Sequence, residues 1–401
     1  MRIRPATADD VDFLTDVVVI ATRDQGRWDP DIDEAAFRRG FSHWTSQLIL
    51  NGGHGNSISV IEVDGLRAGR LRVERGRGRL DLAGLQLLPE FQSNGVGTAI
   101  INELKREAAS AGIPMTLGVE SDNPRAEALY QRLGFRYIDV RDDDRELGWN
   151  AAPGRHPVEA RDGNVLSVHI GGDATAATTV LQLSGGPGCV NYLADLAEGA
   201  PVRVISPDPR GVGGSDGRLF GIDPSIEDLE DLRRWLGIDR WTVVGHSFGA
   251  DLAVIYALRH PEAVTGVIAA CGTGIQNDRD WKAAYDAAKD VEAPIVAFDP
   301  LVHRVMLEDW RELIKGPTLL RELATMDTPV RFVLAERDIR PSWPIEQLAA
   351  LIPGATLDVV PEAPHEFWHS HPDRWRALLR STAAAAPIIP RQRQRKRTAK
   401  L

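Results

Sequence analysis

The sequence predicts an α/β protein built from two domains. At 401 residues, the chain is longer than a common single domain. After residue 163, short apolar runs that end in polar or glycine-rich loops alternate with helical patterns, which is typical of a mostly parallel sheet. Before residue 148, the strand patterns are grouped around a hairpin signal, which predicts a mixed sheet flanked by helices.

Composition and charge narrow the class of protein. A hydrophobic fraction of 43% and a charged fraction of 26% are those of an ordinary soluble globular protein. The net charge of -10 argues against a nucleic-acid partner, and no apolar run approaches the roughly 18 residues of a membrane span. Cys189 and Cys271 are too few for a disulfide framework. We therefore expect a cytoplasmic protein with small-molecule substrates, and the oligomeric state stays open.

Residues 1–148 form the first predicted domain. Residues 1–7 predict a strand, and residues 8–23 predict a helix with an acidic first turn. Residues 57–75 alternate apolar and polar side chains about an Asp-Gly turn, as in a β-hairpin. The remaining patterned segments predict strand, helix, strand and helix in turn: 78–91, 95–112, 115–120 and 124–135.

A linker over 149–156 leads to the second predicted domain, residues 157–383. Its strands are short apolar runs at 164–172, 178–186, 202–208, 241–247, 264–272, 330–336 and 356–362. A less regular stretch with large side chains, at about 274–328, stands between two of these strands and predicts a short lid. The tail over 384–401 is basic and low in complexity, so we expect it to be disordered.

The stretch GHSFG places Ser247 between Gly245 and Gly249, directly after a predicted strand and at the start of a predicted helix. This G-x-S-x-G context is that of a nucleophile elbow, in which a sharp turn exposes a serine hydroxyl. Small residues at the flanking positions allow the strand and the helix to approach closely. Ser247 is therefore the candidate nucleophile.

A serine hydroxyl needs an imidazole base, and the imidazole needs a carboxylate that fixes its tautomer. In a nucleophile-elbow fold the chain order is serine, acid, histidine. Asp338 follows one later strand and His365 follows the next, with Glu336, His369 and His371 as weaker competitors. The three nearby histidines lack a cysteine partner, so no metal is expected there.

The strand ending in LQLSGGPG runs into a glycine-rich turn before the serine in sequence. Acyl transfer needs backbone N–H groups aimed at the developing oxyanion. Gly185 or Gly186 could supply one such donor, and Phe248, after the serine, could supply the other.

Together with PDPRGVGGSDGR, these motifs resemble the α/β-hydrolase superfamily and, within it, the proline iminopeptidase-like branch. The resemblance runs from Pro157 to about Ala383 and implies cleavage of an ester, an amide or a small peptide. Ser184 and Pro209 stand where that branch usually has histidine and glutamine. Acidic lid residues hold the substrate amine in many peptidases of the branch, and the candidates here are Glu308, Asp309 and Glu312.

In the first domain, QSNGVG lies between a predicted strand and a predicted helix. Glycines at a helix start leave backbone N–H groups that can hold an anion. The segment does not fit a dinucleotide fingerprint, which would need glycine at Ile100, and no Gly-Lys-Ser/Thr of a P-loop follows. The alternative is a plain tight connection.

This segment resembles the acyl-CoA motif of the GNAT N-acetyltransferases, and IRPATADDVDFL and NPRAEALYQRLGF resemble two further parts of that family. The resemblance implies a GNAT α+β fold over 1–148, acetyl-CoA as acyl donor, and Tyr130 as the acid that protonates the leaving thiolate. Asp81, Glu120 or a water chain could serve as the base. The residues expected to bind the donor are Leu87, Gln92, Ser93, Asn94, Gly95, Val96, Gly97, Thr98 and Asn123.

The sequence thus predicts a GNAT domain followed by an α/β-hydrolase domain with a short lid. Our first hypothesis is a bifunctional enzyme that acetylates an amine and hydrolyses an ester, an amide or a small peptide. A second is a hydrolase whose GNAT-like domain only senses acyl-CoA. A third, a scaffold with two dead sites, is disfavoured by the intact serine, acid and histidine.

Overall fold

The computed structural model describes residues 1–401 except 52–54, 77, 142–143, 292–295 and 385–401. The chain divides into two compact units. The first comprises Met1–Ile170, Gly214–Arg218 and Asp223–Asp239, and the second comprises the rest of the described chain. The predicted linker at 149–156 stays a prediction, and the predicted tail lies outside the described residues except for Ala384.

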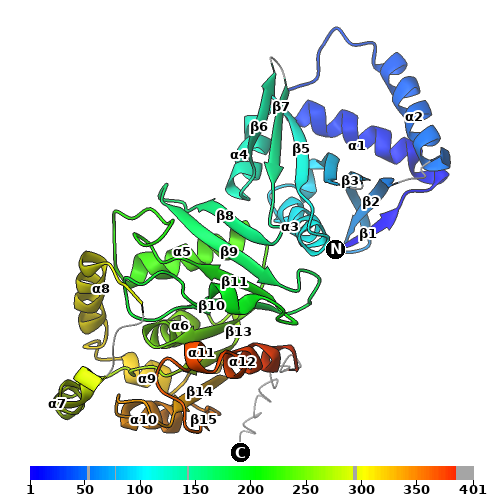
Figure 1. Ribbon diagram of the computed structural model, residues 1–401. Helices are drawn as coiled ribbons and strands as arrows, with labels where there is room; N and C mark the ends of the chain where they lie inside the picture. Colours follow the sequence, from blue (N-terminus) through cyan, green and yellow to red (C-terminus); the bar gives the residue numbers. More distant parts are fainter. Residues whose placement is uncertain (52–54, 77, 142–143, 292–295, 385–401) are drawn as a thin grey trace, which may run out of the picture. The chain divides into compact units, whose positions relative to one another are not determined.

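The first unit contains a seven-stranded sheet in the order β1-β2-β3-β4-β5-β7-β6 (Figure 1). All neighbouring pairs are antiparallel except β4 and β5, which run parallel, so the sheet is mixed as predicted. The strands are β1 Arg2–Pro5, β2 Asn56–Val63, β3 Leu66–Arg75, β4 Leu80–Leu87, β5 Met115–Glu120, β6 Arg136–Arg141 and β7 Asp144–Trp149.

The α-helices within residues 1–148 are α1 Val11–Asp24, α2 Glu34–Asn51, α3 Val96–Ser110 and α4 Pro124–Arg132. An apolar cluster of Leu14, Ile58 and Val60 packs α1 against β2, with Leu48 and Ile49 of α2 beside it. Residues 34–51 were not predicted as a helix, and neither was the β6–β7 hairpin. The helix α2 carries aromatic and polar side chains almost all round and buries only Thr45 fully, so that its sequence has little amphipathic pattern.

Strands β4 and β5 separate after a short stretch of pairing. The parallel register runs from Leu80–Met115 to Leu82–Leu117, while β4 continues to Leu87 and β5 to Glu120. The pairing of β3 with β4 shifts register between Arg72 and Val73, which is the mark of a β-bulge in β4. The sheet therefore opens as a wedge between the carboxyl-terminal halves of β4 and β5.

An eight-stranded sheet has the order β15-β14-β13-β12-β10-β11-β9-β8. Parallel pairing links β15 through to β11, and β8 and β9 form an antiparallel pair. This confirms the predicted alternation of strands and helices. The strands are β8 Gly154–Glu159, β9 Val165–Gly172, β10 Thr179–Leu183, β11 Arg203–Pro207, β12 Trp241–His246, β13 Val264–Ala270, β14 Val330–Ala335 and β15 Thr356–Val360.

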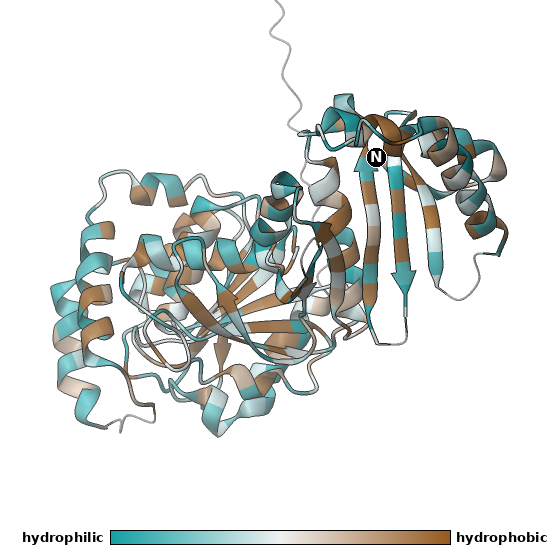
Figure 2. Ribbon diagram, turned by 90° about the horizontal axis from the view of Figure 1, so that it is seen from above, coloured by the Kyte–Doolittle hydropathy of each residue, from teal (hydrophilic) through white to brown (hydrophobic). Residues whose placement is uncertain are grey.

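The strands β10 to β14 are almost wholly buried, and Figure 2 shows hydrophobic strands with helices around them. The segment between β13 and β14 is helical, as expected for a lid insertion. The helices are α5 Ile222–Trp235, α6 Phe248–Arg259, α7 Arg279–Ala288, α8 Pro300–Leu313, α9 Leu319–Leu323, α10 Trp343–Leu351, α11 Phe367–Ser370 and α12 Pro372–Ala384.

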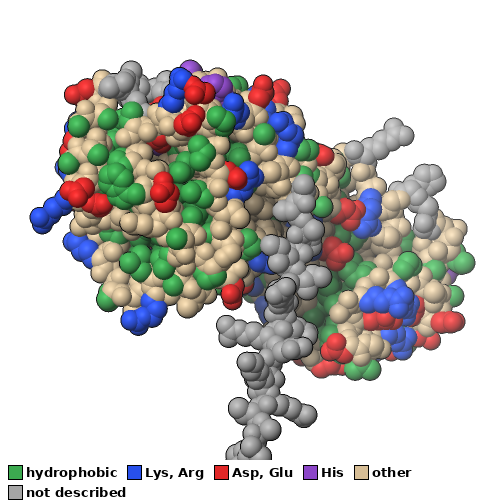
Figure 3. Space-filling view, turned by 90° about the horizontal axis from the view of Figure 1, so that it is seen from below, with side chains coloured by type: hydrophobic (Ala, Val, Ile, Leu, Met, Phe, Trp, Pro, Cys, Tyr) green, Lys and Arg blue, Asp and Glu red, His purple; other side chains and the backbone are tan. Residues whose placement is uncertain are grey.

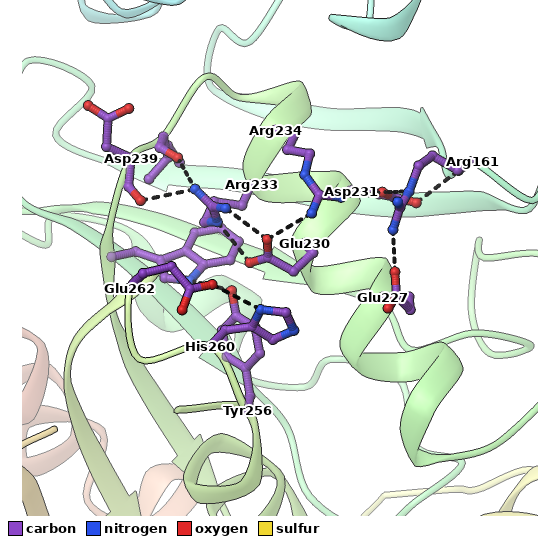
Figure 4. Close-up of polar contacts among 12 residues, drawn as sticks. Arg161, Glu227, Glu230, Asp231, Arg233, Arg234, Asp239, Tyr256, His260 and Glu262 are labelled. Atoms are coloured by element: carbon purple, nitrogen blue, oxygen red, sulfur yellow. Dashed lines mark hydrogen bonds and ion pairs between the residues drawn. The ribbon is translucent and has the colours of Figure 1, made fainter. Parts of the chain in front are cut away.

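Charged side chains hold α5 to the turn between β8 and β9 (Figure 4). Arg161 of that turn donates from its backbone N and its Nε to the carboxylate of Asp231, at 2.8 and 2.5 Å, and it also pairs with Glu227. Within the helix, Glu230 accepts from Nε and Nη2 of Arg233. The charged side chains of α5 therefore fix the helix to the β8–β9 turn and pair with one another along the helix.

The face drawn in Figure 3 carries Lys and Arg side chains scattered among Asp and Glu, with apolar side chains between them. No helix among the described residues is both long enough and apolar enough to cross a membrane.

Candidate active sites

Ser247 lies on a tight turn between β12 and α6. Its φ of +53° is in the left-handed region, where a residue with a side chain is strained. A Cβ at Gly245 would lie 2.2 Å from the carbonyl oxygen of Gly249, and one at Gly249 would lie 2.3 Å from that of Ser184. The two glycines therefore allow the strand, the helix and the neighbouring loop to meet at the serine.

Asp338 follows β14 and His365 follows β15, and the fold brings their side chains together. His365 Nδ1 lies 2.6 Å from Asp338 Oδ2, so that the imidazole donates to the carboxylate. Arg340 donates to the other oxygen, Oδ1, from its backbone N at 2.9 Å and from Nη1 at 3.1 Å. Burial would raise the pKa of Asp338, but the hydrogen bond and the charge of His365 lower it below its ordinary value. Asp338 is thus ionised at neutral pH.

The competing side chains are engaged elsewhere. Glu336 accepts the backbone N–H of Glu362 at 2.7 Å. His371 Nδ1 is hydrogen-bonded to Ser370 Oγ at 2.9 Å, and the ring of His369 lies against Trp368. Asp338 and His365 are consequently the acid and the histidine that the structure brings into contact.

The Ser247 hydroxyl itself makes no hydrogen bond to another described residue. Ser247, Asp338 and His365 follow β12, β14 and β15, whose carboxyl ends share one edge of the sheet. Hydrogen bonds between a nucleophile and its base are often long in a protein without substrate and tighten when substrate binds.

His246, which directly precedes Ser247 in the serine turn, is fully buried and links three loops. Burial holds the pKa of His246 well below its ordinary value, so the ring is neutral. Its Nε2 lies 2.9 Å from the carbonyl oxygen of His365, which can only accept, so the proton resides on Nε2. Nδ1 therefore accepts from the Tyr192 hydroxyl at 2.6 Å, and that hydroxyl accepts the N–H of Gly185 at 2.8 Å.

This chain of hydrogen bonds bears on the predicted oxyanion donors. The N–H of Gly185 already donates to Tyr192, which leaves Gly186 as the other candidate in that turn. Phe248 is the first residue of α6, and the first N–H groups of a helix have no acceptor within it. The ring of Phe248 also packs edge-on against Trp310 of the lid, with ring centroids 5.4 Å apart.

The lid is tied to the glycine-rich turn. Asp299 N–H donates to the carbonyl oxygen of Gly188 at 2.8 Å, and His303 Nδ1 donates to that of Pro187 at 2.8 Å. Two of the acidic lid residues have structural partners: Asp309 accepts the N–H of Ile222 at 2.6 Å, and Glu312 pairs with Lys315 on the surface.

His246, Cys271 and His365 place possible metal-binding atoms within 4.8 Å of one another. Both nitrogens of His246 and Nδ1 of His365 are occupied by the hydrogen bonds described above. Burial raises the pKa of the Cys271 thiol well above its ordinary value, so that it stays protonated. The nitrogen atoms of these two histidines thus hold the loops of the site together through hydrogen bonds.

In the first unit, the loop before α3 has the geometry of an anion site. Gly95 takes a φ of +78° and caps the helix, and Ala99 N–H is the first to find an acceptor, the oxygen of Gly95. The N–H groups of Val96, Gly97 and Thr98 precede it, and the first turn contains no acidic residue. Arg125 of α4 reaches the same loop, donating to Ser93 Oγ at 2.8 Å. These donors fit the phosphate groups of an acyl-CoA.

Several of the predicted donor-binding residues shape the loop itself. Gln92 Nε2 donates to the carbonyl oxygen of Leu87 at 3.0 Å, and Asn94 Nδ2 donates to that of Glu90 at 3.3 Å. Asn123 caps α4 by accepting from Ala126 N–H at 3.2 Å.

Tyr130 lies on α4, beside the ring of Phe135, and its hydroxyl has no hydrogen-bond partner among the described residues. Burial raises the pKa of Tyr130 to about 12. The hydroxyl therefore keeps its proton at neutral pH, as a proton donor requires.

The two candidate bases lie at opposite ends of the wedge. Asp81 is at its closed end, about 20 Å along β4 from Leu87, and accepts from Thr116 Oγ1 at 2.6 Å. Glu120 ends β5 at the open end and forms an ion pair with Arg27.

Three side chains of these sites were not singled out from the sequence: His246, Tyr192 and Arg125. His246 was visible inside the serine motif, and Arg125 inside NPRAEALYQRLGF. Tyr192 carries no sequence signal, because only the fold brings it to the serine turn.

With this geometry in hand, comparison with known families identifies both domain types. The model described as the Acetyltransferase (GNAT) family matches residues 24–135, and the model described as the alpha/beta hydrolase fold matches residues 178–318. The chain therefore contains a GNAT acetyltransferase domain followed by an α/β-hydrolase domain, which confirms the two predicted domain types. A GNAT domain implies an acyl-CoA as donor.

Curated relatives include proline iminopeptidases. The chain is 34% identical over 115 residues to a putative proline iminopeptidase of Mycoplasma genitalium, covering 26% of this chain and 36% of that protein. It is 36% identical over 101 residues to the proline iminopeptidase of Saccharolobus solfataricus, covering 23% of this chain and 33% of that protein. The chain thus matches about a third of the length of these relatives.

Solved structures with a similar arrangement include a proline iminopeptidase from Mycobacterium smegmatis. It is 18% identical, with a TM-score of 0.45, and the match covers 58% of this chain and 98% of that one.

Proposed function

We propose that the chain is a bifunctional enzyme: an acetyl-CoA-dependent N-acetyltransferase and a serine hydrolase of esters, amides or small peptides. The observation that carries the hydrolase is the strained Ser247 at the same sheet edge as the His365–Asp338 pair, 2.6 Å apart. The observation that carries the transferase is the wedge between β4 and β5 beside an anion-binding loop.

In the hydrolase reaction, the Ser247 oxygen bonds to the substrate carbonyl carbon as its proton passes to His365 Nε2. Asp338 keeps the other ring nitrogen, Nδ1, protonated and stabilises the resulting imidazolium. The N–H groups of Phe248 and Gly186 donate to the developing oxyanion. The bond to the leaving group breaks as that group takes the proton, and water then releases the acid and restores the serine.

In the transferase reaction, an acyl-CoA supplies an activated acyl group to an amine. The start of α3 and Arg125 bind the phosphate groups of the donor, because free N–H groups and a cation face that loop. Tyr130 holds a proton that the departing thiolate can take.

The activity of relatives named proline iminopeptidases makes an N-terminal peptide bond one candidate substrate of the hydrolase. Two of the three candidate lid acids already have partners, since Asp309 accepts the N–H of Ile222 and Glu312 pairs with Lys315 on the surface, which leaves Glu308 as the remaining candidate for a substrate amine. We therefore propose the broader class of esters, amides and small peptides.

Ser247→Ala tests the proposal, because the variant lacks only the attacking oxygen. We expect hydrolysis of a p-nitrophenyl ester to fall by at least about a thousandfold, while acetyl-CoA consumption with an amine panel is unchanged. Ser225→Ala is the matched control outside the site. If the variant keeps its esterase activity, the assignment of Ser247, Asp338 and His365 as a triad is wrong. If the chain binds acetyl-CoA but consumes none with any amine, the sensor hypothesis is favoured.

A further inference from the structure

Two arginines of the GNAT sheet face the aromatic side of α2. Arg70 and Arg72 alternate with Leu71 on β3, so both point to one face of the sheet. The Arg70 guanidinium carbon lies 5.4 Å from the ring centre of Phe41 and 5.7 Å from that of Trp44. That of Arg72 lies 5.1 Å from Trp44.

The two arginines differ in their partners. Arg72 forms an ion pair with Glu74 and donates to Asn56 Oδ1 at 3.3 Å. Arg70 is only 4% exposed, and its one hydrogen bond among the described residues runs from Nη1 to Gln86 Oε1, at 2.8 Å. Burial, with Arg72 nearby, lowers the pKa of Arg70 to about 10. A buried cation without a carboxylate is rare, because proteins pair the charges that they bury.

Two of the three guanidinium nitrogens of Arg70 have no hydrogen-bond partner among the described residues. Nη1 is taken by Gln86, whereas Nε is enclosed without a partner. Nη2 makes no hydrogen bond to a described residue, so Nε and Nη2 remain as two parallel donors. Such a fork matches the two oxygens of a carboxylate.

The Arg70 guanidinium lies against β4, at the strand that borders the wedge. Gly84 of β4 faces Arg72 across the bulge, and a Cβ there would lie 2.7 Å from Arg70 Nη1, so the glycine leaves room for the guanidinium. Gly84 belongs to the part of β4 that has already separated from β5. Its neighbour Leu85 points to the other face, where its Cδ2 would lie 3.9 Å from a Cβ on Gly97 at the start of α3. The donor loop and the Arg70 guanidinium are thus on opposite faces of the same strand.

We propose that Arg70 binds the carboxylate of the amine that is acetylated, so that the acceptor is an amino acid or a short peptide with a free amine. This inference rests on the proposed acetyltransferase function. A carboxylate brings the single negative charge and the planar pair of oxygens that the buried fork lacks. A phosphate dianion would leave a second charge uncompensated between apolar rings.

The test uses amines that differ only in the carboxylate. Leucine is compared with 3-methylbutylamine and phenylalanine with 2-phenylethylamine, while O-phosphoethanolamine represents a phosphate. Thiol release from acetyl-CoA gives kcat/KM for the full chain, for Arg70→Met and for the control Arg72→Met. We expect Arg70→Met to lose about 10- to 100-fold with the amino acids, as for a lost charged hydrogen bond, and less than about 3-fold with the plain amines. For the control Arg72→Met, the change in kcat/KM should differ by less than about 3-fold between the amino acids and the plain amines.

Calorimetric titration of the same ligands in the presence of CoA measures binding independently of turnover. If no amine is acetylated but leucine binds and Arg70→Met abolishes that binding, the transferase function fails and the carboxylate site stands. If leucine and 3-methylbutylamine react and bind equally, or if the phosphate is preferred, the carboxylate site is overturned.

Folding of Arg70→Met is checked by thermal unfolding. Because the variant removes an unpaired buried charge, we expect its unfolding temperature to equal or exceed that of the natural chain. A large fall in unfolding temperature together with equal losses for both ligand classes would show a structural role and overturn the proposal.

Discussion

His246 links the base loop to the glycine-rich turn at the scale of single residues. Its neutral ring accepts from Tyr192 and donates to the backbone of His365, while the Tyr192 hydroxyl receives the N–H of Gly185. Each group in this chain has one possible role, because a carbonyl only accepts and a neutral imidazole has one donor and one acceptor. We infer that Tyr192 and His246 are positioning residues for the proposed hydrolase.

Tyr192→Phe removes the hydroxyl and leaves His246 Nδ1 buried without a donor. We expect kcat for a p-nitrophenyl ester to fall about 10- to 50-fold, which is the cost of an unsatisfied buried group, with KM changed less than about 2-fold. Tyr285→Phe is the matched control, because that tyrosine stacks on Trp281 in the lid. A rise in KM without loss of kcat, or equal effects in both variants, would contradict the positioning role.

Asp251 is a buried acid one turn into α6. It accepts from Thr273 N and Oγ1 at 2.9 and 2.7 Å and from Gly274 N at 3.0 Å. Burial nevertheless raises the pKa of Asp251 from 3.8 to about 6. The native state therefore holds this proton more tightly than the unfolded chain, so the stabilisation is complete below pH 3.8 and is lost as the pH rises through about 6.

Asp251→Asn removes this titration. The natural chain loses the stabilisation from this proton as the pH rises, and the variant does not. From pH 4 to pH 7, the unfolding free energy of the variant should therefore increase relative to that of the natural chain by up to about 3 kcal/mol. Chemical denaturation at several pH values measures the difference. Asp373→Asn, at a side chain that is 91% exposed, is the control and should show little pH dependence. A difference that shrinks as the pH rises would refute the raised pKa.

At the scale of elements, each candidate site lies where a strand meets a helix. The turn from β12 to α6 presents Ser247, and the loop from β4 to α3 presents a row of N–H groups. The elements supply what single residues cannot: a strained backbone at one site and a helix start at the other.

Gly97→Val tests the loop before α3 with little backbone strain. A Cβ at Gly97 meets only Leu85, at 3.9 Å, whereas Gly95 has a φ of +78° that a side chain would strain. The valine methyl groups would cover the N–H donors, so we expect acetyl-CoA affinity to fall at least about 10-fold by calorimetry, or about 1.4 kcal/mol. Ser110→Val, at the other end of α3, is the control. Unchanged affinity in Gly97→Val would refute this donor site.

At the scale of the whole molecule, one chain combines two kinds of acyl chemistry. The proposed hydrolase transfers an acyl group to water, and the proposed transferase moves one to an amine. If Arg70 selects a carboxylate, the acceptor is an amine that carries a carboxyl group. Cleavage of a small peptide releases molecules with a free amine and a carboxyl group. A product of the proposed hydrolase would then belong to the same chemical class as the acceptor of the proposed transferase.

The local motifs could be predicted from the sequence because their signals are short. The G-x-S-x-G turn, the acid and the histidine each follow a strand, and QSNGVG opens a helix, so chain order alone pointed to these residues. The helix α2 and the β6–β7 hairpin were missed, since the first lacks a clean apolar stripe.

By itself, the sequence determined the two domain types, the strand and helix order of the second, and the residues at the serine turn, because local periodicity and glycine placement carry that information. Only the tertiary structure decided which acid meets His365, that Tyr192 and His246 hold the turn, and that Arg70 is buried without a carboxylate. The contacts of His246, for example, join residues that are 54 and 119 positions apart along the chain, Tyr192 and His365. Such contacts form only when the sheet is assembled.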